Sequence, residues 1–301
     1  MSLKTFISNF LTISRANIQI ASLPTVALGI FFGANSLSAV LNLHTLIYIV
    51  LFFVSLTFSC NLNCLYDLSV DEKYKTYMSN ALKSLGRRNV KIILLAELFI
   101  IFSLIGYLIL ENYLITSLFS ILGLFFGIIY SMKPLRLKKR GILSPIPVLI
   151  GLYTLPLLGG WYLFNDSLSP TFLFFVILYA LMNEGFTLVN TCEDYSEDKK
   201  EGIITWAHVF GLKKTLIMAL LFSSSGFLCL ITLLMQINTL SISYLFLVLF
   251  FFGIMYSVRD VYLVGKSKDL EKSAKKYGPK MRIWFMITRY PLFFTTIFLL
   301  I

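Results

Sequence analysis

Asn63-Cys-Leu-Tyr-Asp67-Leu-Ser-Val-Asp71 ends a long apolar run and leads into the first strongly charged loop. Its asparagine and two aspartates are four residues apart, so on a helix they form one stripe of oxygen ligands. The same pattern returns 127 positions later, at Asn190, Asp194 and Asp198. Mg2+ prefers oxygen ligands and often shares its coordination shell with substrate phosphates. The two stripes therefore predict a membrane-embedded site for a metal-bound, phosphorylated substrate.

The composition around these motifs is that of an integral membrane protein. Of the 301 residues, 57% are hydrophobic and only 14% are charged, whereas soluble domains carry about 25% charged residues. We expect the whole chain, 1–301, to form one all-α transmembrane domain. Runs of about 20 apolar residues predict nine spans, at about 11–33, 43–66, 91–110, 113–132, 143–164, 170–192, 213–236, 241–258 and 283–301.

The net charge of +11 is distributed as in a membrane protein, not as in a nucleic-acid-binding protein. Lys and Arg gather in the loops that follow the acidic motifs and are absent from the connections near 34–42, 111–112, 165–169 and 237–240. Because cytoplasmic loops carry the excess of Lys and Arg, we expect a multi-pass protein of the cell membrane. The N-terminus and the active-site loops would be cytoplasmic and the C-terminus outside. Part of the basic charge would meet the headgroups of the lipid bilayer.

An internal repeat extends beyond the acidic motifs. Gly127-Ile-Ile-Tyr-Ser131 is matched by Gly253-Ile-Met-Tyr-Ser257, and a glycine precedes an apolar span in each half, at Gly86 and Gly211. Four spans per repeat preserve the membrane orientation, which indicates two parallel repeats, about 11–140 and 143–265. The predicted fold is about nine transmembrane helices around a central cavity, with the two acidic stripes facing each other across it.

The four aspartates Asp67, Asp71, Asp194 and Asp198 are the predicted catalytic residues. One of them acting as general acid and another as general base is possible in principle, but four clustered carboxylates repel one another unless a metal neutralises them. An amide oxygen coordinates a metal without adding charge, so both asparagines belong to the predicted metal set: Asn63, Asp67, Asp71, Asn190, Asp194 and Asp198. The structural alternative is that these side chains cap helix ends in a solvated loop.

A cationic segment, Tyr130-Ser-Met-Lys133-Pro-Leu-Arg136-Leu-Lys138-Lys139-Arg140, lies at the same predicted membrane face. Lys and Arg neutralise a diphosphate and stabilise it as it departs. We expect Lys133 and Arg136 to matter most, because the three later cations run outward into a screened loop. The alternative role for this segment is to determine topology. The predicted diphosphate-binding set is Arg15, Asn63, Lys75, Tyr130, Lys133, Arg136 and Asn190. Glu97, Glu184 and Arg289 also lie in or near spans, where helix–helix pairing is the modest interpretation.

At these residues the chain resembles the UbiA superfamily of membrane prenyltransferases. Both acidic motifs, the glycine and threonine that follow the second (Gly202 and Thr205), the tyrosine–basic segment, and Arg15 with Asn17 are similar to the family's motifs. The resemblance implies nine helices around a central cavity and Mg2+-dependent transfer of a prenyl group from a prenyl diphosphate. The acceptor would be aromatic, such as a quinone precursor, or a membrane-partitioned lipid.

One departure from the family pattern leaves the acceptor open. Many members carry Arg-Pro shortly after the first motif, but the segment 72–86 has none, and Lys73 or Lys75 would have to supply the cation. Alternatives within the chemistry are a UbiA-like terpene cyclase and a polyprenyl-phosphate sugar-phosphate transferase. A divalent-cation transporter is an alternative of another class, but it would place carboxylates near the bilayer midplane.

Overall fold

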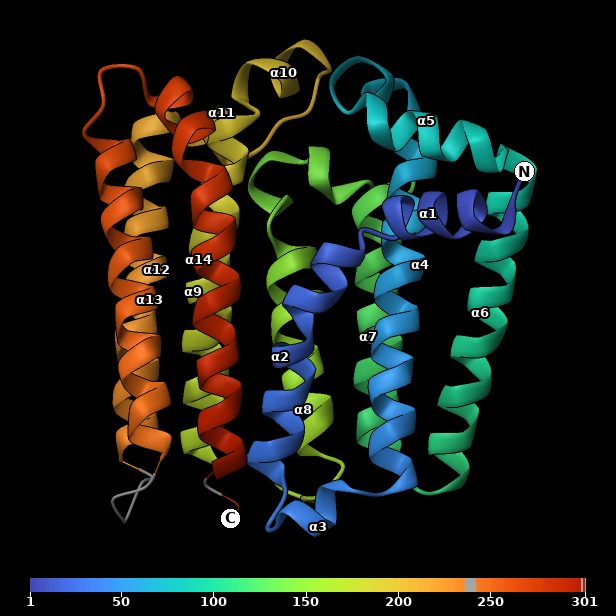
Figure 1. The fold of residues 1–301 in the computed structure, drawn as a ribbon, viewed down its shortest axis with the longest axis vertical. Helices are drawn as coiled ribbons and strands as arrows, with labels where there is room; N and C mark the ends of the chain where they lie inside the picture. The colour runs from blue at the N-terminus through green and yellow to red at the C-terminus, as the bar shows by residue number, and fades with distance from the viewer. Residues whose placement is uncertain (236–241, 299, 301) are drawn as a thin grey trace.

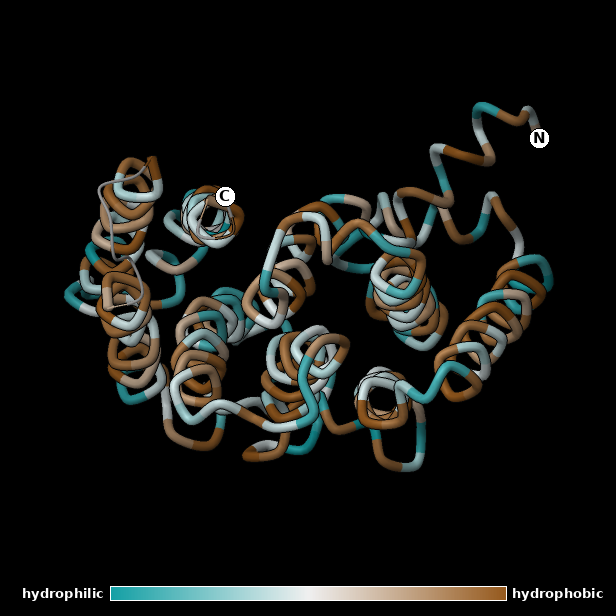
Figure 2. The backbone as a smooth tube through the Cα atoms, turned by 90° about the horizontal axis from the view of Figure 1, so that it is seen from below, coloured by the Kyte–Doolittle hydropathy of each residue, from teal (hydrophilic) through white to brown (hydrophobic). Residues whose placement is uncertain are grey.

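The computed structural model describes residues 1–235, 242–298 and 300, with the backbone alone at 282 and 285. The predicted connection 237–240 and the ends of the neighbouring spans fall outside these residues. The described chain is a bundle of long helices that run side by side, with short helices across one end (Figure 1). Viewed end-on, the bundle is wider in one direction than in the other, and hydrophobic residues recur along all of its long helices (Figure 2). The all-helical membrane architecture predicted from the sequence is confirmed.

Eight segments of the described chain are long and apolar enough to cross a membrane. They are α2 (Ala16–Gly33), α4 (Leu43–Tyr74), α6 (Arg87–Leu110), α7 (Leu114–Ser131), the segment Gly141–Trp161, α9 (Pro170–Glu193), α12 (Leu212–Leu234) and α13 (Ser243–Gly265). The last long helix, α14 (Leu270–Phe298), packs against α13 and α9. It is not one of the eight, so the predicted count of nine is not confirmed.

The expected first span is two helices. α1 (Leu3–Ile13) ends before Arg15, whose backbone is left-handed with φ 51°, and α2 begins at Ala16. α1 lies across the end of the bundle (Figure 1). Leu3, Ile7 and Leu11 are exposed on one of its faces. An amphipathic helix of this kind fits the membrane surface better than the bilayer core.

The predicted span 143–164 is interrupted as well. The one-turn 3-10 helix η2 (Gly141–Leu143) ends where the span begins, and the π-helical segment η3 (Pro147–Thr154) and α8 (Leu155–Trp161) follow within it. Prolines in this stretch remove backbone donors, and such changes of helix type are typical where the i→i+4 ladder is broken. Short helices also follow each acidic motif: α5 (Thr76–Leu85) after the first, and α10 (Tyr195–Lys200) and α11 (Trp206–Phe210) after the second. α3 (Leu37–Val40) lies at the opposite end (Figure 1).

Two glycines begin equivalent helices in the two halves of the chain. Gly86, with φ 85°, precedes α6, and Gly211, with φ 81°, precedes α12. Glycine adopts positive φ without the steric cost that a Cβ would add. The equal conformations agree with the internal repeat that the sequence pattern predicts.

A proline in α2 is compensated by the last helix. Pro24 has no N–H, so the carbonyl of Ile20 lacks its usual helical donor. The hydroxyl of Tyr290 on α14 donates to that carbonyl at 2.8 Å. Its neighbour Arg289, which is 1% exposed, donates to the carbonyl of Ala21 at 2.7 Å. α14 therefore supports the weak point of α2, and Arg289 has the helix-pairing role expected for an intramembrane arginine.

Both acidic motifs lie at the same end of the bundle. α4 and α9 each end on the side where α5 and α10 lie, at the top of Figure 1. The N-terminus is at this end and the C-terminus at the other (Figure 1). The predicted relation between the motifs and the termini is therefore present in the fold.

Candidate active site

A cavity of about 350 Å3 opens below the acidic motifs. Its walls come from α2, α4, α7, α9, α14 and the segment 147–156. Four residues of the predicted diphosphate set line it: Arg15, Asn63, Tyr130 and Asn190. Most of the remaining lining is apolar or aromatic, as in ligand cavities that enclose a hydrophobic group. The cavity thus joins a polar mouth to an apolar interior.

The length of α4 places the first motif at the mouth. Its 32 residues correspond to about 48 Å, well beyond the roughly 30 Å hydrocarbon core of a bilayer. Asn63 lies on the cavity wall, and Asp67 and Asp71 are one and two turns further along the same helix. The predicted stripe is therefore present on α4, close to the membrane surface.

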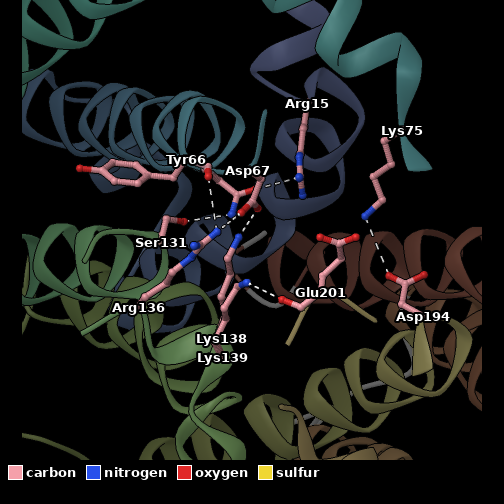
Figure 3. A network of polar contacts seen from close by, with 11 residues as sticks. Arg15, Tyr66, Asp67, Lys75, Ser131, Arg136, Lys138, Lys139, Asp194 and Glu201 are labelled. Carbon is pink, nitrogen blue, oxygen red and sulfur yellow. Dashed lines mark hydrogen bonds and ion pairs between the residues drawn. The ribbon is translucent and has the colours of Figure 1, made fainter. Parts of the chain in front are cut away.

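Asn63 connects three elements of the mouth. Its amide oxygen accepts a hydrogen bond from the guanidinium of Arg15 at 2.9 Å, and its amide nitrogen donates to the hydroxyl of Ser131 at 2.9 Å. Figure 3 shows Arg15 and Ser131 on opposite sides of this network. The oxygen predicted to bind a metal is thus already paired with a cation predicted to bind diphosphate, and Ser131 is a partner that the sequence analysis did not single out.

Asp67 is held by two cations from the basic segment. The guanidinium of Arg136 bonds its carboxylate at 2.7 Å, and the ammonium of Lys138 contacts the other carboxylate oxygen (Figure 3). The side chains of Arg136 and Lys138 are only 14% and 10% exposed, whereas Lys133 is exposed. The expectation that Lys138 runs outward is therefore wrong, while the role of the exposed Lys133 in diphosphate binding stays a prediction. The cause is a turn at Arg136, with φ 40°, which directs the chain back over the mouth.

Lys138 is in an unusual environment for a lysine. Its ammonium lies 5.6 Å from the centre of the Tyr130 ring. Burial lowers its pKa to about 8, despite the opposing effect of Asp67. Lys139 donates to the backbone carbonyl of Glu201 at 3.1 Å. Arg140 donates to the carbonyls of Pro134 and Leu135, so all three cations assigned to the solvated loop are engaged in polar contacts at this end of the bundle.

The second motif differs from the first in its backbone. α9 ends at Glu193 and α10 begins at Tyr195, so the predicted second stripe is not on one uninterrupted helix. The helical backbone hydrogen bonds nevertheless continue across this break. The amide of Asp194 donates to the carbonyl of Asn190 at 3.2 Å, and the amide of Asp198 donates to the carbonyl of Asp194 at 2.8 Å. Burial, together with the neighbouring charge of Asp194, raises the pKa of Asp198 to about 7.

Lysines of the first half reach the loop of the second half. The ammonium of Lys75 is 3.9 Å from the carboxylate of Asp194 (Figure 3). Lys73 pairs with Glu201 at 2.8 Å. These are the two lysines expected to replace the missing arginine, whereas the sequence did not predict Glu201 as the partner of Lys73. Its only signal was its position between the second motif and Gly202.

The backbone also joins the two halves at this end. The amide of Gly141 donates to the carbonyl of Ile204 at 2.8 Å, next to an isolated bridge between Arg140 and Ile204. The indole of Trp206 donates to the carbonyl of Ile142 at 2.8 Å. The basic segment and the loop after the second motif are therefore fixed to each other.

The donor chemistry of the mouth fits a hard divalent cation, but no preassembled carboxylate cage is present. Within residues 1–235, 242–298 and 300, no group of three His, Cys, Asp or Glu side chains is close enough together to hold a metal ion. Oxygen ligands are what Mg2+ prefers, and Mg2+ usually completes its shell with water and substrate phosphates. Carboxylates paired with Lys and Arg provide both signs of charge that a metal diphosphate needs. The mouth therefore fits a metal that arrives together with a phosphorylated substrate.

In the second half of the chain, Arg259 corresponds to Lys133 of the basic segment, and it does not line the cavity. Arg259 pairs with Asp260 at 2.8 Å and stacks on Tyr256, with its guanidinium carbon 4.8 Å from the ring centre. Asp260 is 1% exposed, while Arg259 is about half exposed. Arg259 is thus paired with its neighbour, so the contacts of the two halves differ at this position.

The fold and the site together define an integral membrane protein of α-helices with an apolar cavity below a charged mouth. The chain matches the model of the UbiA prenyltransferase family over residues 22–286 and belongs to this family. No curated protein sequence matches the chain.

Solved structures share the fold at low sequence identity. A UbiA homologue from Archaeoglobus fulgidus, bound to GPP and Mg2+, is 17% identical, with a TM-score of 0.66, covering 96% of this chain and 99% of that one. A structure of digeranylgeranylglyceryl phosphate synthase is 18% identical, with a TM-score of 0.67, covering 97% and 99%. The apo structure of a homologue from Aeropyrum pernix K1 is 16% identical, with a TM-score of 0.62, covering 89% and 95%.

Proposed function

We propose that the protein transfers a prenyl group from a prenyl diphosphate to an acceptor within the membrane. The observation that carries the proposal is the position of the paired charges around Asp67 directly above an apolar cavity. A diphosphate requires cations and an isoprenoid tail requires an apolar enclosure, and one molecule needs both at adjacent positions. Family membership and the ligands named for the solved relatives support this assignment.

Mg2+ is the cofactor that we propose. The ligands would come from the two motifs: Asn63, Asp67, Asp71, Asn190, Asp194 and Asp198. A bound divalent ion would neutralise the diphosphate and make it a better leaving group. Because Asn63 and Asp67 are paired with cations, metal diphosphate would have to exchange with those contacts. Arg136 and Lys138 would then bind phosphate oxygens in place of the carboxylate.

The reaction that we propose breaks the C–O bond between the prenyl group and diphosphate. The departing diphosphate takes the bonding electron pair and is stabilised by the cations of the mouth, including Arg15. Aromatic rings in the cavity wall, such as Tyr130 and Phe126, attract the allylic cation that remains. The acceptor supplies the electron pair for the new bond, and the apolar walls exclude water that would otherwise capture the cation.

The acceptor would bind on the wall formed by α9 and α14. Thr187 and Arg289 are polar groups that line this wall, and the hydroxyl of Tyr153 lies 3.4 Å from that of Thr187. Such groups suit the polar end of an aromatic quinone precursor or of a lipid with a free hydroxyl. We therefore retain both acceptor classes.

The decisive experiment incubates purified protein in detergent or nanodiscs with labelled prenyl diphosphates, Mg2+ and a panel of aromatic and lipid acceptors. Prenylated acceptor that forms with Mg2+ and not in excess chelator supports the proposal. A cyclised product without acceptor would identify a terpene cyclase instead. Transfer of a sugar phosphate, or Mg2+ uptake into liposomes without prenyl turnover, would identify the other two alternatives.

A further inference from the structure

The cavity has two walls of different polarity. One, the α4–α7 wall, comprises the lining residues between Tyr48 and Asn63 of α4 and between Phe119 and Tyr130 of α7. Along α4, the lining positions recur every three or four residues, so the wall follows one continuous helix face. It is mainly apolar, whereas the α9–α14 wall carries Thr187 and Arg289. Burial of an isoprenoid tail against the apolar α4–α7 wall would therefore be more favourable than burial against the α9–α14 wall.

The length of this wall can be stated from helix geometry. The 15 residues from Asn63 to Tyr48 correspond to about 22 Å at the α-helical rise. An extended chain advances about 1.2 Å per bond, as in a polypeptide with three bonds per residue. Four main-chain bonds make one isoprene unit, so each extended unit needs about 5 Å by the same measure. The wall therefore has room for about four units below the mouth.

Tyr48 closes the lower end of this wall. It is 4% exposed and its hydroxyl donates to the carbonyl of Pro156 on α8 at 2.8 Å. A Cβ at Gly159 would lie 2.3 Å from that hydroxyl, so the glycine leaves the space that the ring occupies. Tyr48 is thus fixed by α8, and a tail that reaches it cannot continue without displacing a buried, hydrogen-bonded ring.

We propose that Tyr48 limits the prenyl donor to about four isoprene units and that the tail lies along the α4–α7 wall. This inference rests on the proposed function, because the length of the wall limits the tail only if the diphosphate is held at the mouth. The donors that fit this wall are prenyl diphosphates with 10 to 20 carbons. Donors of 30 carbons or more would not fit.

Two substitutions on one face of α4 should change the limit in opposite directions. Tyr48→Ala removes the lower closure, so donors of 30 and 40 carbons should be accepted. Ser55 lines the same face, eight residues or about 12 Å from Asn63. Ser55→Phe should block the wall at about two units, so that a 20-carbon donor is rejected while a 10-carbon donor is retained.

Two further variants separate a length effect from a loss of stability. Tyr48→Phe keeps the ring and should keep the wild-type limit. Tyr107→Ala removes a tyrosine from α6 that does not line the cavity, and it should leave the length profile unchanged. Retained turnover of a 10-carbon donor reports in each case that the protein is folded.

The measurements are turnover of donors from 10 to 40 carbons and, separately, binding of non-hydrolysable diphosphate analogues of the same lengths. The wild type should lose at least tenfold in both between 20 and 30 carbons, Tyr48→Ala should recover the 30-carbon compound, and Ser55→Phe should lose the 20-carbon one. If the analogues show this pattern without any turnover, the length limit stands and prenyl transfer fails. If neither variant changes the profile, Tyr48 does not set the limit and the tail lies elsewhere.

Discussion

Asp67 is the residue on which the charges of the mouth converge, since Arg136 and Lys138 both contact it. Asp194 is its counterpart in the second half and lies near Lys75. We expect Asp67→Ala and Asp194→Ala each to lower kcat by at least about 100-fold, because a lost charge contact to a leaving group costs several kcal/mol in the transition state. Steady-state turnover at saturating donor measures this.

The control for these two variants is Asp166→Ala, which removes an exposed carboxylate outside both motifs. It should retain wild-type turnover and melting temperature. Full activity of both Asp67→Ala and Asp194→Ala, or full activity in excess chelator, would contradict a metal-diphosphate mechanism.

Lys138 and Lys133 form a matched pair in one segment. Lys138 is buried against Asp67 and Tyr130, while Lys133 is exposed to solvent that screens its charge. We expect Lys138→Met to raise the KM for the donor or lower kcat by at least about tenfold, since the lost charge-assisted hydrogen bond is partly shielded from water. Lys133→Met should change either constant less than about threefold. The reverse order would place the diphosphate on the outer side of the basic segment.

We expect Asp198 to make the proposed metal binding depend on pH. Burial and the charge of Asp194 raise its pKa to about 7, so the carboxyl holds a proton below that pH and must release it to coordinate Mg2+. Because a raised pKa means that protons compete with the metal at lower pH, apparent Mg2+ affinity should fall by up to about tenfold per unit below pH 7. Thermal-shift titrations with Mg2+ at pH 6 and pH 8 measure this.

Asp198→Asn provides the control for the pH effect. It should weaken Mg2+ binding at pH 8 and remove most of the difference between the two pH values. An unchanged pH dependence in this variant would assign the proton to another group.

At the scale of the element, α14 stabilises α2 through one hydroxyl. Tyr290→Phe removes the donor to the Ile20 carbonyl and leaves the ring, so we expect a loss of about 1–2 kcal/mol in unfolding free energy. Tyr77→Phe, at a side chain that is 65% exposed, is the control and should have no measurable effect. Denaturant unfolding in detergent compares the two, and equal stability would show that water satisfies the carbonyl of Ile20.

At the scale of the whole molecule, we expect the distribution of Lys and Arg to set the orientation in the membrane. The two termini lie at opposite ends of the bundle (Figure 1). With the loops that follow the acidic motifs in the cytoplasm, an N-terminal epitope tag should be protected from external protease in intact cells, and a C-terminal tag should be cleaved. The opposite result would place the charged mouth outside the cell.

Much of this architecture could be predicted from the sequence because its signals are local. The length of apolar runs gives the helices, and four-residue spacing places Asn63, Asp67 and Asp71 on one face of α4. Loop conformation has no such periodicity. The inward position of Lys138 depends on a left-handed Arg136 and on backbone contact between Gly141 and Ile204, more than 60 residues apart. Those contacts exist only after the two halves have assembled.

The break in the first span was missed for a related reason. Neither Gly nor Pro flanks Arg15, and a mainly apolar run follows it. The sequence therefore predicts a single helix over residues 11–33. The turn is stabilised by distant partners: the carboxamide oxygens of Asn61 and Asn63 accept hydrogen bonds from Ser14 at 3.2 Å and from Arg15 at 2.9 Å. Tertiary hydrogen bonds of this kind leave no trace in hydropathy.

The pairing of Tyr290 with Ile20 has a consequence for biogenesis. A ribosome releases the first span hundreds of residues before the last one, yet the Pro24 interruption leaves a backbone carbonyl, that of Ile20, which pairs with Tyr290 of the last helix. During that interval, α2 would carry an unsatisfied carbonyl in or near the bilayer. A nascent chain stopped before Tyr290 would therefore present a first helix that still lacks this hydrogen bond.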